Sequence, residues 1–156
     1  MKRKVLLIED NIDDVDLTLR AFRKNNFKNE ITVAYDGAEA LEYLESTESD
    51  DYKKDTPALI LLDIKLPKID GLEVLKYIRT NKFTRLVPVV MLTSSREERD
   101  ISRSYELGAN SYIRKPIDFN SFVEAITCIG LYWLFFNEIP GNFPENCNNN
   151  FVNIPC

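Results

Sequence analysis

The sequence predicts an α/β protein built on a doubly wound, five-stranded parallel sheet with helices on both faces. Four short runs that are mainly apolar and bounded by polar or turn residues are typical of buried strands: 4–8, 31–35, 58–62 and 87–92; a short fifth strand is expected over 111–114. Segments with apolar residues at helical spacing follow these runs, so strand and helix alternate five times. Such alternation specifies a parallel sheet, because each crossover helix returns the chain in the same direction.

The first three helices follow their strands directly. Asn11 is a suitable N-cap for the first helix, whose apolar positions recur at helical spacing: Ile12, Val15, Leu19 and Phe22. The second and third helices are expected over 38–44 and 72–80. The polar stretch 46–56 is expected to be a surface loop or a helix extension, because apolar strand residues resume directly after it.

Residues typical of helix ends mark the fourth and fifth helices. Ser95 followed by Glu98 predicts a capping box at the start of the fourth helix, and Gly108 stands where a helix-ending glycine belongs. Asp118 is expected to cap the fifth helix, which continues into 129–136, IGLYWLFF. This last segment is apolar on nearly all sides, whereas a helix that covers a sheet needs only one apolar stripe. We therefore expect an exposed apolar patch there; the alternative is that the segment after it folds back through Phe143 and Phe151 and buries the patch.

The overall composition limits the possible functions. The chain has 156 residues and a net charge of −5, which fits one domain over 1–136 and argues against a general nucleic-acid surface. The last segment, 137–156, is expected to be an irregular tail. Histidine is absent, so Ser-His-Asp and Cys-His catalysis are excluded. No apolar stretch is expected to span a membrane, and the three cysteines show no CxxC spacing, so we expect a cytoplasmic protein without a disulfide framework.

Polar residues follow four of the expected strands: Glu9 and Asp10, Asp63, Thr93, and Lys115. The carboxyl ends of parallel strands lie at one edge of a doubly wound sheet, so we expect these side chains to meet. Crowded carboxylates repel one another, and Mg2+ would relieve this repulsion. Asp63 is then predicted to be a nucleophile that accepts a phosphoryl group, whose oxygens Mg2+, Thr93 and Lys115 can contact.

Each of these residues also has a structural explanation. Asp10 alone is more simply a helix cap, Asp63 a turn residue, and Thr93 and Lys115 ordinary solvated side chains. Their placement at one edge in this chain order favours the functional interpretation.

The chain resembles the receiver domain of two-component response regulators over about 4–129. The resemblance rests on the motifs LLIEDN, LILLDIKLPKIDG, VVMLTSS and SYIRKP. It implies a flavodoxin-like sheet with strand order 2-1-3-4-5. The segment EDNIDDVDLTLRAF, the long polar stretch and the Trp-bearing extension look like the small stand-alone regulators that partner phytochrome-type histidine kinases.

The resemblance also implies roles for residues of the metal site. Asp63 would be the phosphoacceptor and would bind Mg2+ together with Asp10 and the carbonyl of Lys65, while Glu9 would act through water. Lys65 also places a cation at the mouth of the site, where we expect it to slow or alter dephosphorylation.

Further residues would carry the signal. Thr93 and Tyr112 would be the switch pair, Lys115 would contact the phosphate, and the bond before Pro116 would be cis, which is accessible at an X-Pro junction.

Partners follow from the same resemblance. A sensor histidine kinase would donate the phosphoryl group, and no turnover substrate, nucleic acid or membrane is expected. We expect a homodimer through the fourth helix, fifth strand and fifth helix, with a surface formed by Ile129, Tyr132, Trp133 and Phe136. No second domain is expected, so output would be protein–protein contact; the alternative is a phosphoryl shuttle or sink in a relay.

Three other functions remain to be weighed. An aspartyl phosphohydrolase usually has a second Asp two residues after its nucleophile, and Lys65 occupies that position. A flavodoxin-like cofactor binder needs a phosphate loop after the first strand, where Glu9 and Asp10 have the wrong charge. A phosphorylation-independent pseudo-receiver is disfavoured by the complete acceptor set.

Overall fold

The structure, a computed structural model, describes residues 3–48, 56–116 and 118–138. Five strands form one sheet in the order β2-β1-β3-β4-β5, and every neighbouring pair is parallel. The strands are β1 (Val5–Ile8), β2 (Ile31–Ala34), β3 (Leu59–Leu62), β4 (Val89–Thr93) and β5 (Ser111–Arg114). Both the predicted fold class and the predicted strand order are confirmed.

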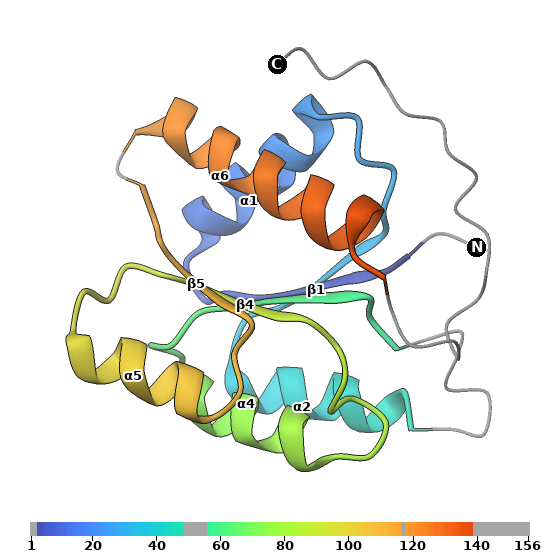
Figure 1. Cartoon of the computed structure of the whole chain (residues 1–156), viewed down its shortest axis with the longest axis vertical. Helices are drawn as coiled ribbons and strands as arrows, with labels where there is room; N and C mark the ends of the chain where they lie inside the picture. The colour runs from blue at the N-terminus through green and yellow to red at the C-terminus, as the bar shows by residue number, and fades with distance from the viewer. Residues whose placement is uncertain (1–2, 49–55, 117, 139–156) are drawn as a thin grey trace.

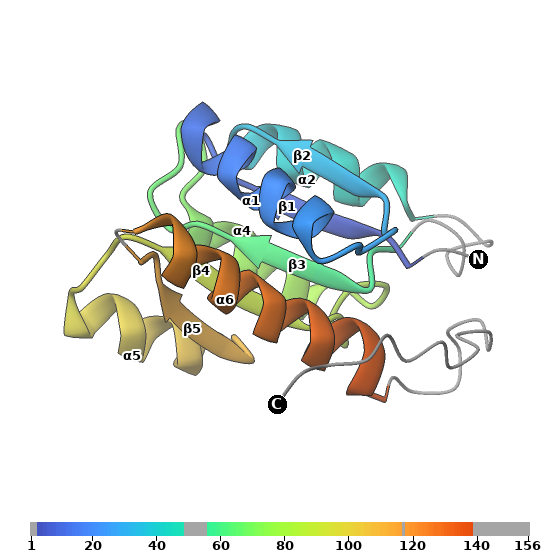
Figure 2. The same ribbon diagram turned by 90° about the horizontal axis from the view of Figure 1, so that it is seen from above.

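Helices cover both faces of the sheet (Figure 1; Figure 2 shows it from above). Helices α1 (Ile12–Lys24) and α6 (Phe119–Leu131) lie on one face; α2 (Gly37–Ser46), α4 (Gly71–Thr80) and α5 (Glu98–Glu106) lie on the other. Successive residues of β1 alternate between two apolar clusters, Leu7 joining the first and Leu6 the second. The sheet is therefore buried on both faces, which explains why its central strands are continuously apolar.

Two of the predicted helix N-caps are confirmed, and a third is wrong. Asn11 caps α1 and Asp118 caps α6, as predicted. The predicted capping box at Ser95 is wrong, because α5 begins after Glu97 and has no side-chain cap. The Ser95 hydroxyl instead donates to the buried carboxylate of Asp100 at 2.5 Å.

Helix α6 ends in a π-helical turn, η1 (Tyr132–Phe136). Leu134 is buried on the α1 side of the sheet, and its carbonyl accepts a hydrogen bond from the Arg3 guanidinium at 2.9 Å. Ile129 is only 3% exposed, so its expected place in a dimer surface is wrong: the helix turns it into the core. An exposed apolar patch does exist, formed by Tyr132, Phe135 and Phe136.

The expectation that no apolar stretch could span a membrane is also corrected. The stretch Phe119–Phe136 has 18 residues and is long and apolar enough to cross a membrane by length and composition. Core helices of soluble proteins pass the same test, and α6 contributes Phe122 and Ile126 to the core. Most of the expected irregular tail (137–156) and of the expected polar loop (46–56) lies outside the described residues, at 139–156 and 49–55 respectively.

Candidate functional site

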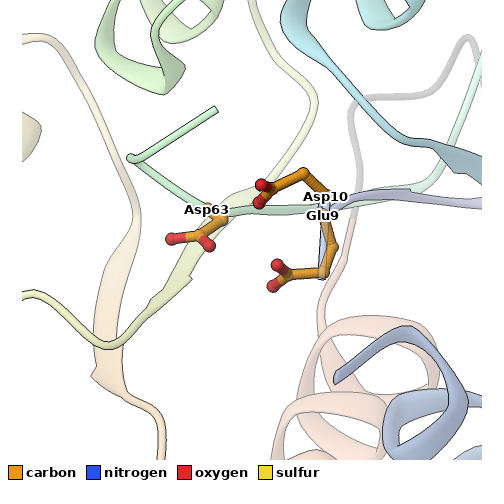
Figure 3. A group of neighbouring side chains, drawn as sticks. All are labelled: Glu9, Asp10 and Asp63. Atoms are coloured by element: carbon orange, nitrogen blue, oxygen red, sulfur yellow. The ribbon is translucent and has the colours of Figure 1, made fainter. Parts of the chain in front are cut away.

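Three carboxylates meet at the carboxyl ends of two neighbouring strands (Figure 3). Glu9 and Asp10 follow β1 and Asp63 follows β3, and one oxygen of each lies within 4.8 Å of the others. Glu9 and Asp63 are buried, whereas Asp10 is exposed. Carboxylate oxygens are the ligands that a hard divalent cation prefers, so this donor set fits Mg2+.

Lys115 brings one positive charge to this acidic group from the end of β5. Its ammonium donates to Glu9, to the Oδ2 atom of Asp14 at 2.9 Å and to the Oδ2 atom of Asp63 at 3.1 Å. The side chain is only 8% exposed. The expected meeting of strand-end residues therefore occurs, and Asp14 joins them although no role at the site was predicted for it.

The charges in this cluster influence one another. Burial, and next the negative charge of Asp63, raise the pKa of Glu9 from 4.5 to about 7, although Lys115 opposes this change. Burial opposes the positive charge of Lys115, but the carboxylates of Asp63 and Glu9 outweigh it and raise the pKa of the ammonium above its ordinary value. Lys115 is therefore a permanent cation facing a carboxyl group that accepts a proton near neutral pH.

The backbone holds Asp63 in place on both sides. Its N–H donates to the carbonyl of Ile8 at 3.0 Å, and its own Oδ1 accepts the N–H of Ile64 at 2.7 Å. Helix α4 begins so close by that a Cβ atom at Gly71 would lie 2.0 Å from the Asp63 carbonyl oxygen. Gly71 therefore allows α4 to start directly beside the acceptor strand.

Thr93 and Tyr112 connect the site to α5. Thr93 is fully buried, and its hydroxyl oxygen accepts the N–H of Ser95 at 3.3 Å. Its carbonyl accepts the N–H of Lys115 at 2.8 Å, which ties the ends of β4 and β5 together. The hydroxyl of Tyr112 donates to the Ser95 carbonyl at 3.1 Å. Both predicted switch residues thus contact the same residue of the β4–α5 loop.

Lys65 follows Asp63 by two residues, and its side chain reaches toward α5. Its side chain is 62% exposed, and its ammonium lies 4.0 Å from the Oδ2 atom of Asp100. Asp100 itself is buried and accepts the Ser95 hydroxyl. Asp100 could not be singled out from the sequence, because a carboxylate within a helix that carries many other charges gives no sign that it turns inward.

The expected cis bond before Pro116 is wrong. The described residues contain no cis peptide bond, so Lys115 and Pro116 are joined in trans. The two isomers of an X-Pro bond differ by only about 0.5–1 kcal/mol, and a sequence motif does not fix such a small difference.

Comparisons with known proteins decide the family. The model of the response regulator receiver domain matches residues 5–127. The chain belongs to the response regulator receiver domain family. Receiver domains are signalling proteins rather than turnover enzymes, so family membership disfavours both the phosphohydrolase and the cofactor binder.

Three relatives illustrate the similarity. The probable methanogenesis regulatory protein FilR2 of Methanothrix harundinacea is 39% identical over 88% of this chain and 87% of its own length. The phosphorylated cyanobacterial phytochrome response regulator RcpA superposes with a TM-score of 0.82 at 35% identity, covering 90% of this chain and all of RcpA. The Mn(2+)-bound form of Rcp1, a response regulator of Synechocystis, gives a TM-score of 0.79 at 33% identity, covering 89% of this chain and 99% of Rcp1.

These relatives also refine the comparison within the family. RcpA is a phytochrome response regulator, and Rcp1 is a response regulator that binds Mn2+. The expected resemblance to small phytochrome-partner regulators is therefore confirmed. The acidic group of Glu9, Asp10 and Asp63 supplies this chain with oxygen ligands for a divalent metal of the same kind.

Proposed function

We propose that this chain is a response regulator that accepts a phosphoryl group on Asp63 from the phosphohistidine of a sensor histidine kinase. The observation that carries the proposal is the position of Asp63 beside the Lys115 ammonium and within a group of carboxylates that suits a divalent cation. Its Oδ2 atom lies 3.1 Å from the Lys115 ammonium, and the carboxylate belongs to the group of three that suits a divalent cation. Phosphoryl transfer depends mainly on positioning and on neutralising charge on the transferred oxygens.

The transfer breaks one bond and forms another. A carboxylate oxygen of Asp63 attacks phosphorus, the phosphorus–nitrogen bond of the donor breaks, and the electron pair leaves with the imidazole nitrogen, which takes a proton. The products are an aspartyl phosphate and a neutral histidine on the kinase. The N–H of Ile64 holds Oδ1 and orients the carboxylate, and Lys115 faces Oδ2, where it can meet a phosphoryl oxygen.

The metal ligands are proposed from the same cluster. Asp10 and Asp63 would hold Mg2+ with their carboxylates, Lys65 with its backbone carbonyl, and Glu9 through water. Mg2+ supplies positive charge that neutralises the phosphoryl oxygens. The donor chemistry supports this assignment, because oxygen ligands at the ends of β1 and β3 converge.

The signal is proposed to leave through the β4–α5 loop. Phosphorylation would give the Thr93 hydroxyl a new oxygen to bond, and Tyr112 would respond through the Ser95 carbonyl that it already contacts at 3.1 Å. The surface of α5, β5 and α6 would then change shape and contact a protein partner in the cytoplasm. Onward transfer of the phosphoryl group in a relay is the alternative output.

A homodimer through the α5-β5-α6 region is part of this proposal. Tyr132, Phe135 and Phe136 are each more than half exposed at the end of α6, although all three are aromatic. Clustered exposed aromatics usually mark an interface, and a second copy of the chain would cover them.

The proposal is tested by incubating the protein with phosphoramidate, with and without Mg2+, and measuring intact mass. We expect one added phosphoryl group that depends on Mg2+ and is absent from Asp63→Asn. Asp16→Asn is the matched control: Asp16 lies on α1, is half-exposed and pairs with Arg20, and the variant should be phosphorylated normally. Unmodified wild-type protein would contradict the proposal, and steady hydrolysis of a small phosphate ester would favour a hydrolase.

A further inference from the structure

Lys115 contacts the carboxylates of Glu9, Asp14 and Asp63. Of these three, Asp14 is the one that the proposed metal site does not explain. It lies in the first turn of α1, and its Oδ2 atom accepts the Lys115 ammonium at 2.9 Å. Its side chain is 27% exposed. Among the described residues, the carboxylates grouped closely enough to hold a metal are Glu9, Asp10 and Asp63, and Asp14 is not one of them.

The three carboxylates that contact Lys115 differ in whether a bound metal ion would compete with the ammonium for their oxygens. An ammonium has three N–H donors, and here it contacts three carboxylates. Glu9 and Asp63 each use their other oxygen for a backbone N–H, that of Asn11 at 3.1 Å and that of Ile64 at 2.7 Å. A divalent cation bound directly by Asp63, and by Glu9 through water, would therefore compete with Lys115 for the same oxygens.

A bound divalent cation would also repel the Lys115 ammonium directly. Without another partner, the lysine side chain would move toward solvent and lose its place beside Asp63. Asp14 offers such a partner on a different element, because α1 holds it outside the metal group. The backbone N–H of Asp14 donates to the Asn11 cap at 3.2 Å, which fixes this first turn.

We propose that Asp14 is a positioning residue that keeps the Lys115 ammonium over Asp63 while a divalent cation occupies the other carboxylates. This inference rests on the proposed function of Asp63 as the phosphoacceptor. Asp14 contacts neither the metal nor the phosphoryl group; it acts through Lys115. One N–H of the ammonium stays with Asp14, and the remaining donors are free for a phosphoryl oxygen.

Asp13 provides a matched control for this proposal. It is the neighbouring residue in the same helical turn, carries the same charge and is exposed. Both aspartates lie in the first turn of α1, where the helix dipole favours negative charge, and both contribute to the negative potential around the site. The difference between Asp14→Ala and Asp13→Ala therefore isolates the contact with Lys115.

The first measurement follows the lysine itself by 1H–15N NMR of its ammonium group. The signal of a lysine ammonium survives when burial and ion pairing slow its exchange with water. Under saturating Mg2+, we expect the Lys115 signal in the wild type and in Asp13→Ala, and its loss in Asp14→Ala. Loss of the signal in the Mg2+-saturated wild type, or its persistence in Asp14→Ala, would overturn the proposal.

The second measurement is the rate of phosphorylation by phosphoramidate, followed by intact mass at saturating Mg2+. A charge-assisted hydrogen bond that is partly exposed to solvent corresponds to about a five- to tenfold slower reaction in Asp14→Ala. Asp14→Asn should be intermediate, because its amide oxygen still accepts from the ammonium, and Asp13→Ala should stay within about twofold of the wild type. The Mg2+ concentration at half-maximal rate should match in the two alanine variants.

The outcomes separate this inference from the proposed function. A wild type that takes up no phosphoryl group contradicts the proposed function, and the NMR signal then decides alone whether Asp14 holds Lys115. A phosphorylated wild type with equal rates in Asp14→Ala and Asp13→Ala contradicts the inference and leaves the proposed function intact. Thermal unfolding of each variant shows whether a slower rate reflects a loss of fold.

Discussion

The sheet edge that carries Asp63 and the far end of α6 depart from ordinary packing in opposite ways. At the sheet edge, charged groups are buried: Glu9 is 2% exposed and Asp63 is 6% exposed. At the end of α6, aromatic rings are exposed: Tyr132 by 54% and Phe136 by 53%. Buried charges cost free energy unless they are paired, and exposed aromatic clusters cost free energy unless something covers them.

The difference indicates what each region interacts with. The carboxylates at the sheet edge lie close enough together to share one metal ion, and Lys115 from the same chain partly compensates their charge. The exposed rings spread along a helix, and a surface of that shape suits a macromolecule. We therefore propose that the first region receives the phosphoryl group and that the second takes part in a protein–protein contact.

Replacing Lys115, the cation that compensates the buried carboxylates, should have the largest effect on stability. Lys115→Met leaves Glu9 and Asp63 buried without their partner, so at pH 8 in EDTA we expect a loss of about 2–3 kcal/mol in the free energy of unfolding. Excess Mg2+ should recover part of this loss. Urea denaturation measures both, and Lys76→Met, which removes an exposed lysine of α4, should change stability by less than about 0.5 kcal/mol. Equal stability of Lys115→Met and Lys76→Met would contradict the account of the buried cluster.

The raised pKa of Glu9 predicts a smaller, pH-dependent effect. Between pH 4.5 and about 7, the folded protein binds more protons on Glu9 than the unfolded chain does. This contribution to stability is complete below pH 4.5 and is lost as the pH rises through about 7. Without metal, Glu9→Gln should therefore exceed the wild type in stability by about 1–2 kcal/mol at pH 8, and the difference should shrink toward pH 4.5.

Urea denaturation in EDTA at several pH values measures this difference. Glu42→Gln, which changes an exposed glutamate of α2, is the control. A difference between Glu9→Gln and the wild type that does not vary with pH would show that burial does not raise the pKa of Glu9.

The proposal that the exposed aromatic rings form a dimer interface is tested by measuring whether the protein associates. If a second copy covers Tyr132, Tyr132→Ser should raise the dimer dissociation constant about tenfold, since a truncated interface aromatic often costs more than 1 kcal/mol. Sedimentation equilibrium, with and without phosphorylation, measures this constant. Tyr35→Ser is the control, because Tyr35 is 45% exposed and follows β2, the outer strand on the opposite side of the sheet from β5. A wild type that stays monomeric at high micromolar concentration in both states argues against the dimer.

The sequence predicted the fold and the strand-end residues because two simple patterns determine them. Apolar runs locate buried strands, and a parallel sheet brings the residues after those strands to one edge, which placed Glu9, Asp10 and Asp63 together. Asp14 could not be distinguished from Asp13, because the choice depends on how α1 is rotated relative to β5. Contacts between elements that a linear pattern does not place side by side remain outside such predictions.

The errors have the same origin. Ser95 was expected to cap α5 from its spacing to Glu98, but the hydroxyl finds a stronger acceptor in Asp100. Ile129 and Tyr132 belong to one apolar run, and only the rotation of α6 on the sheet decides that the first is buried and the second exposed. In each case a tertiary contact selects between local alternatives that are similar in energy.

The smallest predicted effect concerns Lys65, at the mouth of the buried region. Its side chain is 62% exposed and its ammonium lies 4.0 Å from Asp100, so solvent screens much of its charge. A cation here attracts the phosphoryl oxygens and obstructs the approach of water to phosphorus, which should slow hydrolysis. We expect Lys65→Ala to shorten the lifetime of the aspartyl phosphate about two- to threefold, measured by intact mass after removal of phosphoramidate. Lys76→Ala removes the same charge from a remote exposed site and should leave the lifetime unchanged. Equal lifetimes in Lys65→Ala and the wild type would show that the exposed rim of the site does not influence the chemistry of its buried part.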